Sequence, residues 1–237
     1  MRISILTSPL YLQNGVGVGN LSSRVVSQVS RAVEILKAGG LVVFPTDTVY
    51  GLGGDVFNTK VAERIYEVKQ RPRNLPLPVL LADLAQLVAV VDSVPEVAQF
   101  LMRCFWPGGL TLVLPKKDSL PGIITAGGNR VAVRIPDHIV PLTLIREFGA
   151  PVIGTSANIS DKPSPVTAEE VEQQLGGQID LVIDMGKCPG GLESTVVDVT
   201  GETPVILRQG IISEKEIKKA CKEYAREAGK SAYCSGL

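Results

Sequence analysis

Positive charge is concentrated in the segment YEVKQRPRNLPLPVLL, residues 66–81. Lys69, Arg71 and Arg73 lie within five residues, and no acidic residue follows Glu67 in this segment. The three cations stand between a run with helical spacing and a proline-rich apolar run that is typical of a strand. A solvated turn ordinarily mixes both signs of charge, so this pattern favours a site that binds an anion.

Further hydrogen-bond donors and cations stand at the edges of short apolar runs: Thr46, Thr111, Arg134, Ser156, Asn158, Ser194 and Arg208. Each has an ordinary structural explanation, as a turn former or as a residue that favours strands. If Val131 and Val133 point into the core, alternation puts Arg134 on the other face, where an exposed arginine is allowed. Together, with few carboxylates beside them, these residues suit a polyanion such as a nucleoside triphosphate.

Several other kinds of site are excluded or disfavoured. The chain has no G-x-x-x-x-G-K-[ST] motif, so a P-loop does not hold the nucleotide. His138 is the only histidine, which leaves little room for a Ser-His-Asp triad, and we expect it in a turn or at the surface after Pro136-Asp137. The four cysteines show no zinc-finger spacing. No protein side chains are therefore expected to form a metal site.

Composition bounds the class of protein. The 237 residues carry a formal net charge of +0, with 45% hydrophobic and 20% charged residues, as in a globular protein that has a core. A neutral chain does not coat nucleic acid by bulk electrostatics, although a local basic cleft remains open. Scattered cysteines fit a reducing cytoplasm. No apolar run approaches the ~20 residues that span a bilayer, so no membrane association is expected.

The order of predicted elements indicates an α/β fold. Helical spacing over 24–38, 59–69, 95–105, 140–148, 167–175 and 213–228 alternates with short apolar runs that predict strands. No break in composition divides them, so we predict one domain at 23–228 with a twisted, mixed sheet and flanking helices. Residues 1–22 are predicted to be a leader and 229–237 a tail. The NGVGVGN segment of the leader lacks the G-x-G-x-x-G spacing of a dinucleotide loop.

Six blocks of sequence carry a resemblance to a known family. They are PTDTVYGLG (45–53), KQRP (69–72), PGGLTLVL (107–114), VAVRIPDH (131–138), TSANISDKPS (155–164) and STVVDVTGETPVILRQG (194–210). In this order they resemble the YrdC-type threonylcarbamoyl-AMP synthases, in the short, single-domain form. The resemblance implies a YrdC-like domain around a deep cationic cavity.

The resemblance also implies the roles of individual residues. The family's K-x-R and S-x-N signature falls on Lys69, Arg71, Ser156 and Asn158, which would act on ATP. Thr111 and Arg208 are candidates for the nucleotide side of the cavity. Candidates for the L-threonine side are Thr46, Arg134 and Ser194. Leu75-Pro76-Leu77 replaces the His-Pro-Leu of many members, which puts in doubt any contact through that histidine.

By this resemblance the chain is a nucleotidyltransferase, an L-threonylcarbamoyladenylate synthase. It would use ATP, L-threonine and bicarbonate or CO2, with Mg2+ held mainly by ATP and water, and release pyrophosphate. The product serves the synthesis of N6-threonylcarbamoyladenosine at position 37 of transfer RNA. A separate transferase complex would complete that step, and this chain's own contact with transfer RNA would be weak.

Two alternatives stay open from the sequence. One is a carbamoyl-AMP-forming module of hydrogenase maturation, although the zinc-finger and acylphosphatase parts that usually accompany it are not present. The other is an RNA-binding or ribosome-associated module. The cations are compatible with RNA, but aromatic residues for base stacking make up only 5% of the chain.

Overall fold

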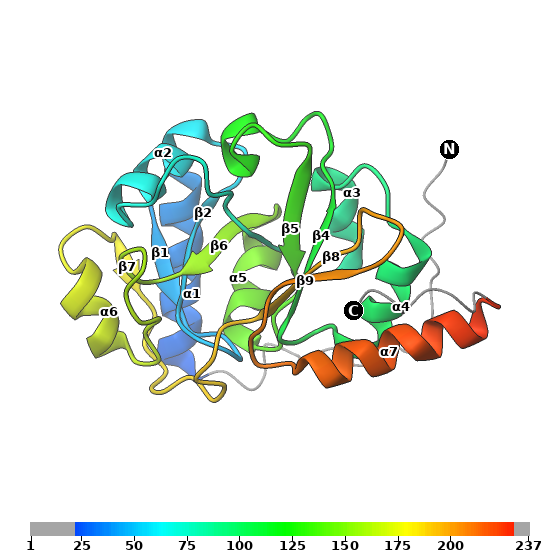
Figure 1. The fold of residues 1–237 in the computed structure, drawn as a ribbon. Coiled ribbons are helices and arrows are strands. Elements are labelled where there is room, and N and C mark those ends of the chain that lie inside the picture. The colour runs from blue at the N-terminus through cyan, green and yellow to red at the C-terminus, as the bar shows by residue number, and fades with distance from the viewer. Residues whose placement is uncertain (1–21, 230–237) are drawn as a thin grey trace.

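Within residues 22–229, the part of the chain that the computed structural model describes, nine strands form one sheet (Figure 1). The predicted leader and tail lie outside these residues, apart from Ser22 and Gly229. The sheet order is β7-β1-β2-β6-β3-β5-β4-β8-β9, with parallel and antiparallel pairs. The strands are β1 (Val42–Phe44), β2 (Gly51–Asp55), β3 (Val79–Leu80), β4 (Leu110–Pro115), β5 (Arg130–Arg134), β6 (Val152–Ser156), β7 (Leu181–Val182), β8 (Thr195–Asp198) and β9 (Val205–Arg208). The predicted α/β class with a mixed sheet is confirmed.

The six predicted helices are all present. They are α1 (Ser23–Lys37), α2 (Thr59–Val68), α4 (Glu96–Phe105), α5 (Ile139–Phe148), α6 (Ala168–Leu175) and α7 (Glu214–Glu227). The sequence did not predict the short α3 (Leu87–Val90) or the 3-10 turns η3 (Leu84–Gln86) and η4 (Gly122–Thr125). His138 caps α5 by accepting a hydrogen bond from the Val140 backbone N–H at 3.2 Å. It was expected in a turn or at the surface, and it is instead a half-buried residue at the start of a helix.

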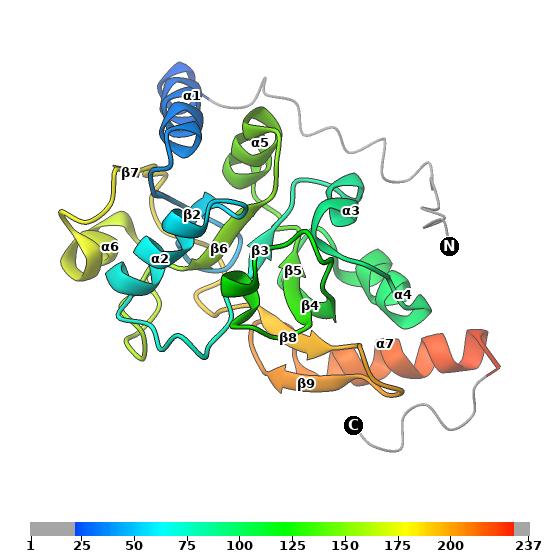
Figure 2. The same ribbon diagram turned by 90° about the horizontal axis from the view of Figure 1, so that it is seen from above.

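Two hydrophobic clusters stabilise the sheet on its opposite faces. On β1, Val42 and Phe44 pack in a cluster with α1 and α5, whereas Val43 belongs to the larger cluster. In the view of Figure 2, α1 and α5 stand together on one side, while α4 and α7 lie on the other. The rings of Phe100 on α4 and Tyr224 on α7 are in contact, with centroids 5.8 Å apart. These layers fix the ends of the strands, and with them the loops that carry polar residues.

Strand β2 is the main element that the sequence did not predict, because its residues are mostly glycine. It lies between β1 and β6 in the sheet and pairs with both in antiparallel orientation. A Cβ on Gly53 would lie 2.6 Å from Cε1 of Phe44, and one on Gly54 would lie 2.3 Å from Cγ1 of Val61. Neighbouring side chains fill the space that a β2 side chain would need, so the strand has no alternating apolar pattern to detect.

Alternation along the central strands builds a polar face. On β5, Val131 and Val133 pack in the core, whereas Ala132 and Arg134 line a cavity on the opposite face. On β4, Thr111 lies on that same cavity face. The predicted alternation is confirmed, but the exposure that it allowed for Arg134 is wrong. The side chain is only 8% exposed, because Asp47, Thr48 and Gly108 surround its guanidinium.

Candidate active site

A cavity of about 620 Å³ opens on the polar face of the sheet. The loop after β1, the end of α2, strands β4 and β5, the loop after β6 and the ends of β8 and β9 surround it. It is lined by all nine residues predicted from the sequence: Thr46, Lys69, Arg71, Thr111, Arg134, Ser156, Asn158, Ser194 and Arg208. Segments far apart in the chain therefore converge on one site.

Lys69 is the most buried of the cations, at 1% exposure. As the C-cap of α2, it directs Nζ at the loop after β6, where it donates to the carbonyl oxygens of Ser156 at 2.6 Å and Asn158 at 2.7 Å, and to Oδ1 of Asn158 at 3.1 Å. Burial, together with the charge of Arg71, lowers the pKa of Lys69 to about 7. In this structure Lys69 ties α2 to the Ser156–Asn158 segment.

Asn158 continues this network on the far side of the loop. Its Nδ2 donates to the carbonyl oxygen of Lys162 at 2.6 Å, while its Oδ1 accepts from Lys69. The backbone N–H of Ser160 donates to the carbonyl oxygen of Lys69 at 2.8 Å. Ser156 and Asn158 of the predicted signature are thus hydrogen-bonded directly to Lys69, the lysine of the same signature. These bonds hold the loop after β6 in position at the cavity wall.

Arg71 lies at the mouth of the cavity. Its Nη2 donates to the carbonyl oxygen of Pro76 at 2.9 Å, and its Nε donates to that of Leu75 at 3.3 Å. The Leu75-Pro76 segment, where the sequence departs from the common His-Pro-Leu, therefore holds the guanidinium through backbone atoms. Arg73, the third cation of the junction, does not line the cavity.

Arg134 and the loop after β1 form a buried polar cluster. The guanidinium donates to Oδ1 of Asp47 at 2.5 Å, to Oγ1 of Thr48 at 3.0 Å and to the carbonyl oxygen of Gly108 at 2.8 Å. Oγ1 of Thr46 lies 2.9 Å from Oγ1 of Thr48. Burial lowers the pKa of Arg134, and the Asp47 carboxylate opposes that shift. Arg134 is therefore linked to Thr46 through the Thr48 hydroxyl, and all three residues line the cavity.

Ser194, Thr111 and Arg208 form a second group of contacts. Oγ of Ser194 lies 2.8 Å from Oγ1 of Thr111, and Nη2 of Arg208 donates to Oγ of Ser194 at 3.2 Å and to its carbonyl oxygen at 3.0 Å. The resemblance assigned Ser194 to the threonine side and the other two to the nucleotide side. The structure places Ser194 in direct contact with both Thr111 and Arg208.

A family model named Sua5/YciO/YrdC, described as telomere recombination, matches residues 34–210. The chain belongs to the Sua5/YciO/YrdC family. All nine predicted residues, which line the cavity, fall inside the matched segment.

Members of the Sua5/YciO/YrdC family with known names are similar to this chain. The threonylcarbamoyl-AMP synthase of Bacillus subtilis is 46% identical over 192 residues, which cover 81% of this chain and 56% of that protein. The threonylcarbamoyl-AMP synthase of Vibrio vulnificus is 38% identical over 161 residues, 67% of this chain and 87% of that protein. The crystal structure of P. abyssi Sua5 complexed with L-threonine has a TM-score of 0.79 and 44% identity, covering 81% of this chain and 56% of that one. The chain thus spans about half the length of two of these three relatives.

Two acidic residues of this Sua5/YciO/YrdC-family site were missed as functional candidates. The sequence alone does not indicate Asp47 or Glu193 as site residues. Asp47 is the buried partner of Arg134, and Glu193 lines the cavity beside Arg208. Asp47 directly follows Thr46 and Glu193 directly precedes Ser194, so adjacency to a predicted site residue was the signal that could have found both.

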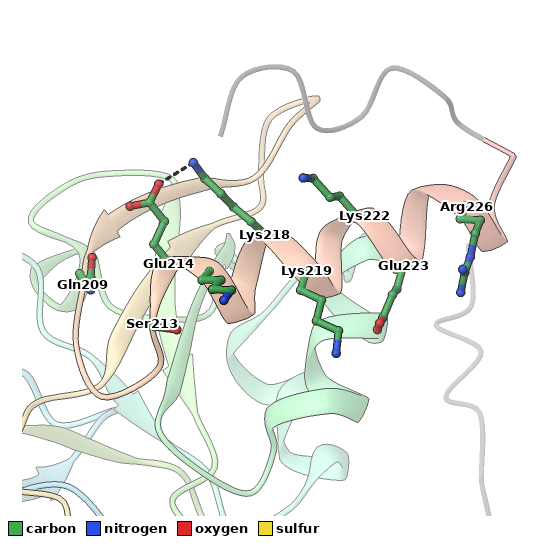
Figure 3. Close-up of a pocket in the computed structure, with 9 residues that line it drawn as sticks. Gln209, Ser213, Glu214, Lys218, Lys219, Lys222, Glu223 and Arg226 are labelled. Carbon is green, nitrogen blue, oxygen red and sulfur yellow. Dashed lines mark ion pairs between the residues drawn. The ribbon is translucent and has the colours of Figure 1, made fainter.

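A larger hollow, of about 840 Å³, lies along the outer side of α7 (Figure 3). Charged side chains of that helix line it, including Lys218, Lys219 and Lys222, and Lys218 pairs with Glu214 at 2.6 Å. None of the nine predicted residues, all of which the structure describes, contributes to it. Long cationic side chains on an exposed helix face are ordinarily solvated, so the smaller cavity is the candidate active site.

Within residues 22–229, no group of three or more histidine, cysteine, aspartate or glutamate side chains could hold a metal ion. Over the same residues, no helix combines the length and apolar composition that crossing a membrane requires.

Proposed function

We propose that this chain is an L-threonylcarbamoyladenylate synthase, which converts ATP, L-threonine and bicarbonate or CO2 to threonylcarbamoyl-AMP and pyrophosphate. The observation that carries the proposal is the convergence of Lys69, Arg71 and Arg208 with several hydroxyl donors on one cavity. The names of the B. subtilis and V. vulnificus relatives, and the L-threonine complex of P. abyssi Sua5, support it.

The reaction needs no nucleophile from the protein. The threonine nitrogen attacks CO2, supplied directly or by dehydration of bicarbonate, and loses a proton to form an N-carboxylate. A carboxylate oxygen then attacks the α-phosphorus of ATP, and the bond from that phosphorus to the bridging oxygen breaks as pyrophosphate leaves. The protein therefore contributes orientation and stabilisation of charge. A cavity rich in cations and hydroxyl groups, without a paired histidine, suits these tasks.

In this proposal the residues of the cavity have different tasks. Arg71 and Arg208 contact the triphosphate, and Thr111 supports that side. Lys69 contributes positive charge from a buried position in the cavity wall, and its hydrogen bonds hold Ser156 and Asn158 in place. On the other side, Arg134 bonds Thr48, whose hydroxyl contacts that of Thr46, and Thr46 would face the amino acid. Ser194, in contact with Thr111, would lie between the substrates.

Mg2+ fits this site only together with ATP. Magnesium in nucleotide enzymes is ordinarily held by one or two carboxylates and the substrate phosphates, and Glu193 and Asp161 are the carboxylates that line the cavity among the described residues. When bound, the ion neutralises phosphate charge during displacement of pyrophosphate.

The product would pass to a separate transferase complex in the cytoplasm that modifies position 37 of transfer RNA. The balanced charge of the chain argues against strong binding of RNA by this protein alone. Among the alternatives, an RNA-binding module would not show ATP turnover that depends on threonine, and a carbamoyl-AMP-forming module would use carbamoyl phosphate instead.

Discrimination among amino acids tests the threonine side of the cavity. We expect product formation from L-threonine to exceed that from L-serine and to exceed that from L-valine much more strongly. Valine lacks the hydroxyl and would leave polar groups of the site buried without partners, at about 1–3 kcal/mol for each group. Rates of adenylate formation with each amino acid measure this, and equal use of valine would contradict the assignment.

A further inference from the structure

Glu193 occupies the donors that the proposed function assigns to ATP. Its carboxylate accepts hydrogen bonds from Nη1 of Arg208 and from Oγ of Ser164, and it also bonds the side chain of Ser156. Lys69 adds its charge to the same environment. Arg208 and Ser156 are both predicted to act on the nucleotide, so an acidic side chain of the protein holds part of the predicted phosphate site.

Glu193 is an anion in this setting. Burial alone would raise the pKa of its carboxyl, but the hydrogen bond from Ser164 and the charge of Arg208 hold that pKa below its usual value. Its side chain is 29% exposed and reaches the cavity, so it can leave Arg208 by rotating, without refolding the chain. A phosphate group that contacts Arg208 must first displace this carboxylate and then lie close to its negative charge.

We propose, resting on the proposed function, that Glu193 is a displaceable counter-ion that makes nucleotide binding depend on a divalent cation. Without a cation, Glu193 competes with phosphate for Arg208 and repels it, since like charges a few ångströms apart interact strongly in a partly buried site. With a divalent cation on the phosphates, the displaced carboxylate faces positive charge. Glu193 is thus a positioning residue for Arg208, and its displacement is coupled to the metal.

Calorimetric binding of ATP to the full chain, without threonine, tests this directly. Wild-type protein should bind ATP at least about tenfold more tightly in Mg2+ than in EDTA. Glu193→Gln keeps the shape of the side chain and removes its charge, so this variant should bind ATP in EDTA about tenfold more tightly than wild type does. The ratio of the ATP affinity in Mg2+ to that in EDTA should therefore be smaller in the variant.

Glu67→Gln is the matched control. Glu67 also lies beside an arginine, Arg73, at 3.8 Å, but its side chain is 71% exposed and does not line the cavity. For the control variant, the ratio of ATP affinity in Mg2+ to that in EDTA should equal the wild-type ratio. Thermal unfolding verifies that each variant is folded, and Glu193→Ala replaces Glu193→Gln if the amide disturbs the fold.

The outcomes separate the two proposals. The counter-ion role is supported if the ratio of ATP affinity in Mg2+ to that in EDTA decreases in the Glu193 variant and not in the control. An unchanged ratio in the Glu193 variant, an equal decrease in Glu67→Gln, or failure of both Glu193 variants to fold would overturn that role and leave the proposed function standing. If wild-type protein binds ATP in neither condition, the proposed function itself fails.

Discussion

Replacing Arg134 with methionine should lower the free energy of unfolding by about 3–5 kcal/mol. The substitution keeps much of the side-chain volume but removes the ion pair with Asp47 and the hydrogen bonds to Thr48 and Gly108. Asp47, whose side chain is 16% exposed, would then be a largely buried carboxylate without its cation. Chemical denaturation followed by tryptophan fluorescence measures the loss.

Arg73→Met provides a control in an exposed ion pair. Arg73 lies 3.8 Å from Glu67, and the two side chains are 56% and 71% exposed. An exposed pair contributes about 1 kcal/mol or less, so this variant should remain close to wild type. Adding Asp47→Asn to Arg134→Met should restore part of the lost stability, because the uncompensated charge is gone. Equal losses in Arg134→Met and Arg73→Met would show that the Arg134 cluster does not contribute as a buried ion pair to the stability of the protein.

Loss of either tetrad cation should impair ATP use by roughly ten- to a hundredfold. Lys69→Ala or Arg71→Ala removes a charge-assisted contact, which is worth about 1.5–3 kcal/mol. Lys69→Ala should also loosen the loop at 156–160, since Nζ binds its carbonyl groups. The kcat/KM for ATP measures the first effect, and hydrogen exchange of that loop measures the second.

Arg73→Ala is the control for charge alone. Arg73 belongs to the same cationic junction, but its side chain is 56% exposed, lies 3.8 Å from Glu67 and does not line the cavity. ATP use should therefore stay at the wild-type level. Wild-type kinetics in folded Lys69→Ala and Arg71→Ala proteins would remove the basis for a phosphate site here.

Periodicity predicted the helices well, because their buried faces repeat every three or four residues, as Val25, Val29 and Leu36 do on α1. Periodicity did not predict β2, because the side chains of Phe44 and Val61 occupy the space beside Gly53 and Gly54. The strand therefore has no alternating pattern of apolar residues. Elements that bury their own apolar side chains, such as α1, can therefore be predicted from the local sequence. A glycine-rich strand such as β2, which is covered by side chains of other elements, cannot.

The positions of the site residues could be predicted, but their contacts could not. Alternation placed Arg134 on the correct face of β5, whereas its burial depends on the loop that carries Asp47, 87 residues away in the chain. Lys69 was expected to point at phosphates, and its carbonyl partners arise only when α2 and β6 are brought together. Such pairings belong to tertiary structure.

Pyrophosphate release by the purified chain tests the central claim most directly. With ATP, Mg2+, L-threonine and bicarbonate present, we expect pyrophosphate and threonylcarbamoyl-AMP to form in equal amounts, because each adenylate that forms expels one pyrophosphate. Omission of L-threonine should abolish release, and depletion of bicarbonate and CO2 should depress it strongly, since they supply the carbonyl carbon. Pyrophosphate release that ignores both threonine and bicarbonate would contradict the proposed chemistry.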